Sequence, residues 1–280
     1  MANANGSAAK NISPNDDLTQ QTIGDFGDQW TRYTDNPGYY GSTELLADII
    51  EPLLPVASIA GAQIADIGSG TGRIVNMLLD AGAAHIVAVE PSEAMRALRR
   101  NTAERAERIT YVHGRGEMLP PSGDRDIVVS IGVLHHIPDP APVVQAASAA
   151  LKPGGLLFVW LYAHEGSEVY LRFARPLRAL TTRLPHALLS ALCHALNVAL
   201  DVYIALARWL PVPLGDYARN VIGRSPRRVR YLTIYDQLNP AYAKYYTQDE
   251  AVALLADAGL LDISTYHRHG YSWSVIGRQP

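Results

Sequence analysis

The sequence predicts an α/β fold in which a doubly wound sheet carries helices on both faces, a helical insertion and a C-terminal antiparallel hairpin. Apolar strand patterns alternate with helical patterns over residues 58–163, and this alternation is typical of parallel sheets. A glycine-rich turn joins the first strand of that series to its first helix. The alternation stops at residue 164 and returns near residue 241, which indicates an insertion between two parts of one sheet.

Composition limits the class of protein. The chain has 280 residues, of which 48% are hydrophobic and 18% charged, which suits one globular domain with an insertion or two small domains. A net charge of −3 gives no global field that favours nucleic acid. Cys193 is the only cysteine, which excludes an internal disulfide and a cysteine-rich metal site. Residues 1–24 lack the apolar segment of a signal peptide, so we expect a flexible tail on a cytoplasmic protein.

The elements follow in order. Residues 25–57 are expected to form an aromatic-rich N-terminal lid and a helix over 43–54. In the core at 58–163 we expect the strands 63–67, 85–90, 109–113, 125–131 and 155–162, and the helices 73–81, 92–106 and 141–151.

The C-terminal part of the sheet is expected at residues 241–280. Thr247 can cap a helix because Glu250 follows three residues later, and Gly259 is expected to end that helix. Two strands near 261–267 and 271–278 then form the closing hairpin.

Residues 164–240 are expected to form a helical cap. Leucines recur there every three or four positions, and residues 187–210 are strongly apolar. Asp201 and Arg208 interrupt that stretch, so we favour a cap that packs on the core or on a second subunit in a homodimer over a membrane-spanning helix. The arginines that follow are expected to form a solvated face, with an anionic substrate group or a membrane surface as the alternative; they are Arg224, Arg227, Arg228 and Arg230.

The glycine-rich turn carries the functional information. Residues 65–73 read Ala-Asp-Ile-Gly-Ser-Gly-Thr-Gly-Arg, between an apolar strand and an apolar helix. Glycines let the backbone pass close to a ligand, and the first N–H groups of the helix face it. The next strand ends in Glu90, an acid placed to bind a ribose diol. Arg73 stands one residue after the third glycine, so the run does not fit the Gly-x-Gly-x-x-Gly dinucleotide fingerprint.

This Asp-x-Gly-x-Gly-x-Gly form, with the later acid, resembles the class I S-adenosylmethionine-dependent methyltransferases. Three further segments fall in the order of that family, at residues 113–120, 130–139 and 151–155. The last two resemble the ubiquinone/menaquinone-biosynthesis type, which acts on small molecules. The resemblance implies a Rossmann-like sheet whose last strand is antiparallel, and S-adenosyl-L-methionine as cofactor.

The resemblance also implies the cofactor site. Asp66 would hold the methionine amino group, the turn would bend around the methionine, and Glu90 would accept both ribose hydroxyls. Arg115 stands where the family has an aspartate that reaches the adenine amino group, so that side-chain hydrogen bond is absent. The backbone at Arg115 and Gly116 would still bind adenine; the alternative for Arg115 is a solvated charge. The implied cofactor-binding residues are Asp66, Gly68, Ser69, Gly70, Gly72, Glu90, Pro91, Met95, Arg115, Gly116, Glu117 and Ile131.

The reaction implied is a metal-independent in-line displacement of methyl by a small organic acceptor. A hydroxyl oxygen is the first choice of acceptor atom; thiol sulfur, carbon, a lipid acceptor and a noncatalytic cofactor-binding protein are alternatives. His135, His136 and Tyr245 are the candidate catalytic residues, with a structural or gating role as the alternative for the histidines.

Aromatic and histidine side chains are candidates for the lid and the substrate pocket, because aromatic rings attract a sulfonium and phenols can orient a nucleophile. The alternative is ordinary packing of half-buried rings. These candidates are Trp30, Tyr33, Tyr39, Tyr40, Tyr242, Tyr246, His267 and His269.

Overall fold

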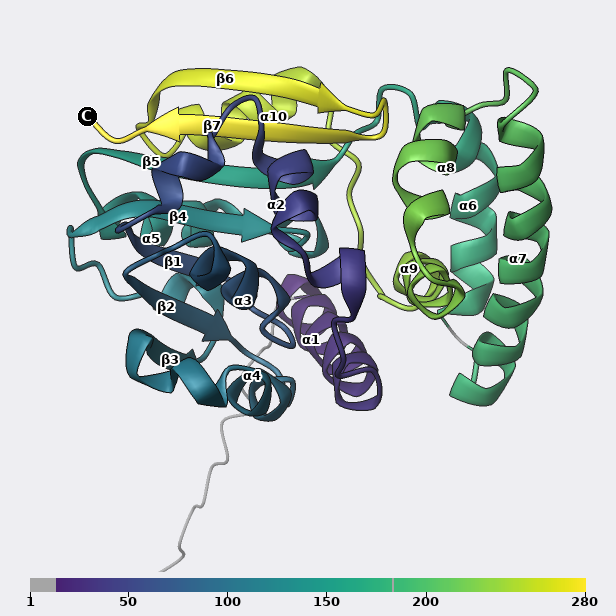
Figure 1. Ribbon diagram of the computed structural model, residues 1–280, viewed down its shortest axis with the longest axis horizontal. Helices are drawn as coiled ribbons and strands as arrows, with labels where there is room; N and C mark the ends of the chain where they lie inside the picture. Colours follow the sequence, from purple (N-terminus) through teal and green to yellow (C-terminus); the bar gives the residue numbers. More distant parts are fainter. Residues whose placement is uncertain (1–13, 183) are drawn as a thin grey trace, which may run out of the picture.

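A single seven-stranded sheet forms the core of the protein. The structure, a computed structural model, describes residues 14–182 and 184–280. The strands lie in the order β3-β2-β1-β4-β5-β7-β6 (Figure 1). Their bounds are β1 Gln63–Ile67, β2 His85–Glu90, β3 Ile109–His113, β4 Arg125–Ile131, β5 Leu151–Tyr162, β6 Leu261–Arg268 and β7 Ser272–Arg278. β1 to β5 are parallel, and β7 is antiparallel to both β5 and β6. The predicted fold class is confirmed.

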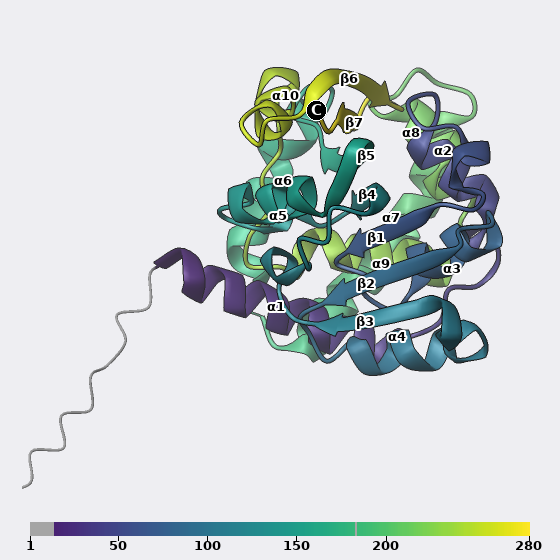
Figure 2. The same ribbon diagram turned by 90° about the vertical axis from the view of Figure 1, so that its left-hand side faces the viewer.

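Helices cover both faces of the sheet (Figure 2). One face packs on α2 (Thr43–Ile50), α3 (Arg73–Asp80) and α4 (Met95–Asn101), and the other on α5 (Ala141–Ala150) and α10 (Gln248–Ala256). Successive strand residues point to opposite faces. Ile64 therefore belongs to the first core and its neighbour Ala65 to the second.

Two predicted helices are shorter than expected. The helix expected over 43–54 ends at Ile50, because Glu51 precedes Pro52 and takes an extended conformation (φ −80°, ψ 153°). The helix expected over 92–106 begins at Met95 and ends at Asn101, and a separate 3₁₀ segment covers Ala103–Arg108. The capping box of Thr247 and Glu250 is present as predicted.

The described residues of the insertion, 164–182 and 184–240, form four α-helices: α6 (Glu168–Thr181), α7 (His186–Ala207), α8 (Gly215–Asn220) and α9 (Arg227–Leu238). It lies beyond the carboxyl ends of β1, β4 and β5 (Figure 1). The arginines that follow α7 in sequence are engaged in ion pairs, because Arg224 pairs with Glu44, Arg228 with Asp35, and both Arg227 and Arg230 with Asp201. An anionic ligand for these four groups is therefore disfavoured.

The prediction of a flexible tail over residues 1–24 is wrong for its second half. Helix α1 spans Pro14–Arg32, whereas residues 1–13 lie outside the described part of the chain. Asp16 and Asp17 in the first turn of α1 complement the positive end of the helix dipole. Side chains spaced by three or four residues along α1 face the same cavity: Thr19, Thr22, Ile23, Phe26 and Trp30. This tertiary packing stabilises a helix of low overall hydrophobicity.

Candidate active site

One large cavity lies at the carboxyl ends of the parallel strands, between the sheet, α1 and the insertion. Its volume is about 1230 Å³, and residues of β1, β2, α1 and all four insertion helices line it. Small-molecule sites have volumes of about 300–1000 Å³. The cavity therefore has room for a cofactor and a second molecule at the same time.

The turn after β1 forms one wall of the cavity. The N–H groups of Gly68 and Ser69 donate to the carbonyl of Val89 at 2.8 and 3.0 Å, which ties the turn to β2. Gly68 has φ +79°, and a Cβ atom there would lie 2.4 Å from Cγ2 of Val133. Only glycine fits both the backbone conformation and the space at this position.

Glu90 closes the same turn from the end of β2. Its Oε2 accepts from the N–H of Gly70 at 2.8 Å, and its Oε1 accepts from the N–H of Ser92 at 3.0 Å. Burial raises the pKa of Glu90, although the hydrogen bonds from Ser92 and Gly70 oppose this effect. A carboxylate has about four lone-pair sites. Ser92 Oγ also donates to Oε1, so three of these sites are occupied and one remains, on Oε2, for a ligand hydroxyl.

Asp66 is 1% exposed, and its Oδ2 has no hydrogen-bond partner among the described residues. Burial raises the pKa of Asp66 to about 7. A buried carboxylate oxygen without a donor is costly. An ammonium group of a ligand would donate a hydrogen bond to this oxygen and would supply a positive charge to balance the carboxylate. Asp66 itself does not line the cavity, whereas Gly68 and Ser69, which follow it in the turn, do. The orphaned oxygen of Asp66, behind the close-packed glycine turn, fits the ammonium group of the methionine part of S-adenosylmethionine.

The other predicted cofactor residues divide into two groups. Those that line the cavity are Ser69, Gly70, Pro91, Arg115, Gly116, Glu117 and Ile131. Met95 and Gly72 do not line it. Met95 packs in the core, and Gly72 begins α3 in contact distance of Leu98, since a Cβ there would lie 2.9 Å from Leu98 Cδ1. These two positions support the site through packing.

Arg115 forms an ion pair with Asp16, a residue distant from it in the sequence. Its Nη1 lies 3.2 Å from Oδ1 of Asp16 in α1, and both residues line the cavity. Helix α1 thus brings a carboxylate next to Arg115 at the cavity wall. Arg115 is a partly exposed charge with a carboxylate partner, and its role toward adenine stays a prediction.

We expect Glu90→Ala to weaken cofactor binding by about 1.5–3 kcal/mol, the range for hydrogen bonds to charged groups. The substitution removes the acceptor for the ligand and also the anchor of the Gly70 N–H. Isothermal titration with S-adenosylhomocysteine measures the change. Asp249→Asn, an exposed acid in the first turn of α10, is the control and should leave the affinity unchanged. Unchanged affinity in Glu90→Ala would place the ribose elsewhere.

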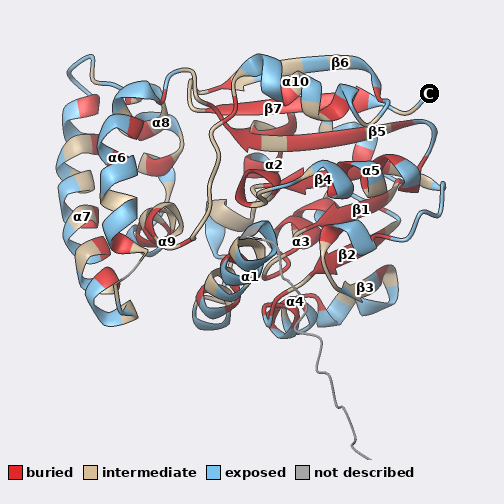
Figure 3. Cartoon of the chain, turned by 180° about the vertical axis from the view of Figure 1, so that it is seen from behind, coloured by how far each residue is buried: buried red, intermediate tan, exposed pale blue. Residues whose placement is uncertain are grey.

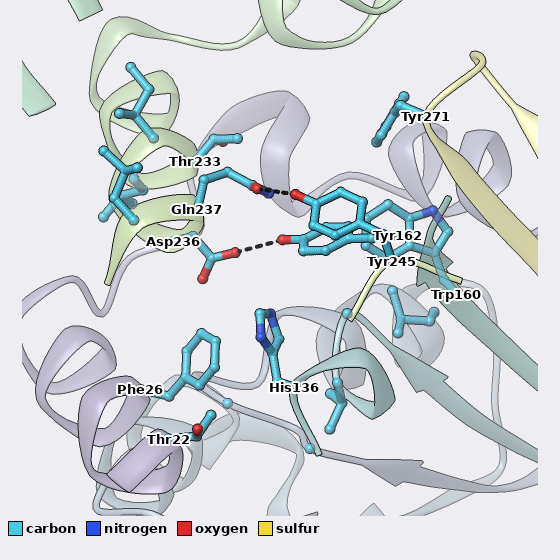
Figure 4. Close-up of a pocket in the computed structure, with 18 of the residues that line it drawn as sticks. Thr22, Phe26, His136, Trp160, Tyr162, Thr233, Asp236, Gln237, Tyr245 and Tyr271 are labelled. Carbon is cyan, nitrogen blue, oxygen red and sulfur yellow. Dashed lines mark hydrogen bonds between the residues drawn. The ribbon is translucent and has the colours of Figure 1, made fainter. Parts of the chain in front are cut away.

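A polar group faces the cavity between α9, β5 and α1 (Figure 4). Asp236 Oδ1 accepts from Gln29 Nε2 at 3.2 Å, and its Oδ2 accepts from the hydroxyl of Tyr162 at 3.4 Å. Within the described residues Asp236 forms no salt bridge. Burial raises the pKa of Asp236 to about 6, close to the value a proton acceptor needs near neutral pH.

His136 lines the cavity beside this carboxylate (Figure 4). Its Nδ1 lies 2.9 Å from the carbonyl oxygen of Tyr242, so Nδ1 donates and Nε2 is the unprotonated nitrogen. Nε2 has no partner among the described residues. Burial lowers the pKa of His136 to about 4, so the ring is neutral at physiological pH. The ring therefore forms part of the cavity wall, while its Nε2 is buried and unpartnered among the described residues.

The other two catalytic candidates have different positions. His135 is fully buried and does not line the cavity, and its ring packs on that of Tyr162 at a centroid distance of 3.9 Å. Tyr245 lines the cavity and donates its hydroxyl to Gln237 Oε1 at 2.9 Å (Figure 4). Burial raises the pKa of Tyr245, which makes it a hydrogen-bond donor and a poor base. His135 is therefore a packing residue.

Three of the four residues predicted for the N-terminal lid lie at the cavity wall. Trp30, Tyr39 and Tyr40 line the cavity, and the guanidinium of Arg73 lies 4.4 Å from the centroid of the Tyr40 ring. Tyr33 does not line the cavity, because its hydroxyl donates to that of Tyr231 at 3.0 Å in the core of the insertion.

The four C-terminal candidates do not line this cavity. Tyr242 contributes its carbonyl to His136, and Tyr246 is buried in the core. His267 stacks on Trp273 at a centroid distance of 4.3 Å. His269 lies between Asp48 and Asp216, with Nε2 2.8 Å from an oxygen of Asp48. Of the four, the two histidines join the hairpin to neighbouring elements, His267 through the carbonyl of Glu165 and His269 through Asp48.

Sequence reasoning missed the polar group around Asp236. Val229, Leu232 and Asp236 recur at the spacing of one helix face, so an acid on an apolar face was a usable signal. Tyr162 gave no signal of its own, because it ends a uniformly apolar strand. Gln29 and Phe26 lie in α1, which the sequence analysis did not predict as a helix.

Comparison with known proteins gives matches of two kinds. A family model described as "Methyltransferase domain" matches residues 65–159. A "Ubiquinone biosynthesis O-methyltransferase" from Aromatoleum aromaticum is 32% identical over 128 residues, which cover 41% of this chain and 54% of that protein. One of the same description from Ralstonia nicotianae is 31% identical over 118 residues, 41% of this chain and 49% of that protein. The chain thus spans about half the length of the curated relatives it matches.

Solved structures share the fold at low sequence identity. Magnesium protoporphyrin IX methyltransferase from Synechocystis, solved with bound S-adenosylhomocysteine, has a TM-score of 0.52 at 14% identity, covering 90% of this chain and 94% of that one. A SAM-dependent methyltransferase from Aquifex aeolicus has a TM-score of 0.51 at 11% identity, covering 91% and 98%. At these identities the likeness concerns the fold alone.

Proposed function

We propose that this chain, whose residues 65–159 form a class I S-adenosylmethionine-dependent methyltransferase domain, methylates a hydroxyl oxygen of a small organic acceptor. The observation that carries the proposal is the position of Asp236. Its carboxylate has no cationic partner among the described residues and faces the same cavity as Glu90 and the glycine turn. A proton acceptor and a cofactor cradle therefore border one enclosed space.

The residues divide the work between binding and proton transfer. S-adenosylmethionine supplies an electrophilic methyl group on a sulfonium that is already a good leaving group. Asp66, Glu90 and the glycine turn hold the cofactor, and the neutral ring of His136 forms the cavity wall beside Asp236 and positions the acceptor by contact. The acceptor oxygen gains the methyl group, its proton moves to Asp236, and the bonding electron pair stays on sulfur. Alignment in such enclosed sites can contribute about 7–11 kcal/mol in the best cases.

A hydroxyl acceptor is favoured over the alternatives by the chemistry of the base. An alcohol or phenol must lose a proton, and Asp236 has a pKa of about 6. A thiol ionises more easily and needs such a base less. The curated relatives that match residues of the core carry the description of O-methyltransferases, which supports the same choice. We further propose a metal-independent reaction in the cytoplasm.

The test is a titration followed by a turnover assay. The chain should bind S-adenosylhomocysteine in isothermal titration and should form it from S-adenosylmethionine when a phenol or alcohol is present. EDTA should leave the rate unchanged. Tight binding without product from hydroxyl, thiol or carbon acceptors would favour a noncatalytic binding protein. Product from thiols alone would replace the hydroxyl by sulfur.

A further inference from the structure

The outer face of α7 is apolar and exposed. Leu188, Val198, Val202 and Leu206 lie on one face of α7, and Trp209, which follows the end of the helix at Ala207, is 87% exposed. We call these five residues the α7 stripe, and no charged residue interrupts it. α7 is the one helix of the described chain that is long and apolar enough to cross a membrane by composition, yet only 22% of its most apolar window is buried (Figure 3). Contiguous exposed apolar surface of this kind marks an interaction site.

The inner face of α7 is fixed to the protein, which decides how the helix can meet its partner. Cys193 packs with Tyr231 of α9, and Asn197 Nδ2 donates to the carbonyl of Arg227 at 2.8 Å. Asp201 in the middle of α7 pairs with Arg227 and Arg230 at 2.7 and 2.8 Å. A helix held in this way presents one face only. It can lie on an apolar phase and does not cross it.

The cavity opens beside the stripe. Val169 and Phe173 of α6 line the cavity and are nevertheless 59% and 71% exposed. Ala199 of α7 is also exposed and lines the cavity. These three residues form a rim between α6 and α7, which lie next to each other at the end of the molecule (Figure 1). The exposed apolar surface therefore continues into the proposed acceptor site.

Charge favours an anionic partner. Residues 164–240 contain ten arginines and five acidic residues, although the whole chain has a net charge of −3. Arg172 and Arg175 of α6 and Arg208 after α7 are exposed. Unlike the paired arginines of α9, these three have no carboxylate partner among the described residues. Basic side chains beside an apolar helix face and a tryptophan are typical of segments that lie on anionic membranes.

We propose that α6 and the α7 stripe dock on an anionic phospholipid bilayer and that the rim admits an apolar acceptor directly from the lipid. The proposal of a docking surface depends only on the exposed apolar residues and the unpaired arginines, and not on the proposed function. The delivery of the acceptor rests on the proposed function, because it requires a methyl acceptor in the cavity. Apolar acceptors dissolve poorly in water, so a cavity mouth in the bilayer gives access at a higher local concentration.

Vesicle flotation tests the docking surface. The full chain should float with vesicles of phosphatidylcholine and phosphatidylglycerol, and more weakly with phosphatidylcholine alone. Val202→Asp should lower binding by at least about tenfold, because it replaces a buried apolar contact by a charge. Leu261→Asp, an equally exposed position of β6 (57%), is the matched control and should bind as the unchanged chain does. Arg172→Gln and Arg208→Gln should each lower binding to the anionic vesicles by about fivefold.

The outcomes separate the two proposals. Failure of the folded chain to float, while it still binds S-adenosylhomocysteine, would overturn the docking surface and leave the proposed function intact. Vesicle binding without turnover of any acceptor would support the docking surface and overturn the proposed function. A dimer in light scattering that Val202→Asp converts to a monomer, together with no vesicle binding, would assign the stripe to a second copy of the chain and overturn the membrane proposal. Equal loss in Leu261→Asp would also contradict it.

Discussion

Asp236→Asn is expected to lower kcat by about 10²–10⁴-fold, the usual contribution of a general base. The amide keeps the size of the side chain but cannot take a proton from the acceptor. Its oxygen can still accept from either Gln29 or Tyr162, so the fold should tolerate the change. The affinity for S-adenosylhomocysteine should stay the same, because Asp236 does not belong to the glycine turn or to β2. Single-turnover kinetics and isothermal titration measure the two effects separately.

The dependence of the reaction rate on pH identifies which residue acts as the general base. Burial raises the pKa of Asp236 to about 6, so the carboxylate is ionised above this pH and becomes protonated as the pH falls through it. The rate should therefore be level above about pH 7 and fall below pH 6. Asp236→Asn should abolish this limb. His136 has a pKa of about 4 and stays neutral over this range. If the limb persists in Asp236→Asn and disappears in His136→Gln, then His136 is the base.

Gly68→Ala should produce the second largest effect, a loss of cofactor affinity of at least tenfold together with lower stability. The backbone has φ +79°, and the added methyl group would lie 2.4 Å from Val133. Backbone strain of this kind costs about 1–3 kcal/mol, and the steric clash adds to it. The glycine turn must shift to relieve the clash, and with it the backbone that lines the cavity and the Gly70 N–H that holds Glu90. Thermal unfolding and titration with S-adenosylhomocysteine measure both consequences.

Two further variants separate the causes. Gly123→Ala has a similar conformation (φ +64°) but nothing within 4 Å of the added atom, so it reports the backbone cost alone and should leave cofactor affinity unchanged. Gly68→Ala with Val133→Ala removes the contacts at 2.4 and 2.7 Å, leaves the Val133 Cβ at 3.1 Å and keeps the backbone strain, so it should recover part of the affinity. Full affinity in Gly68→Ala alone would show that the turn is not the cofactor cradle.

The sheet and the cofactor end of the site could be predicted because local sequence determines them. Parallel strands bring their carboxyl ends to one edge, so Asp66 and Glu90, which end or follow consecutive strands, meet around one turn. The five parallel strands and the capping box followed from periodicity and from the Thr247–Glu250 spacing. These features need no knowledge of distant packing.

The acceptor end could not be predicted in the same way. Asp236, Tyr162 and Gln29 are brought together by three elements separated by more than 70 residues, through contacts that no local pattern specifies. Tyr246 and His267 were predicted to line the substrate pocket because of their residue type. In the structure Tyr246 packs in the core and His267 stacks on Trp273. A tyrosine or histidine can line a pocket or pack in the core, and its tertiary contacts determine which of the two it does.

The proposed proton acceptor and the proposed cofactor-binding residues lie in different segments of the chain. Asp66 and Glu90 belong to the sheet, whereas Asp236 and most of the apolar wall belong to residues 164–240. Grafting a different segment between β5 and α10 would exchange the acceptor and the base in one step, while adenosine recognition stayed as it was. Relatives that differ in this segment should therefore share a cofactor and differ in what they methylate, a modular route to new specificity.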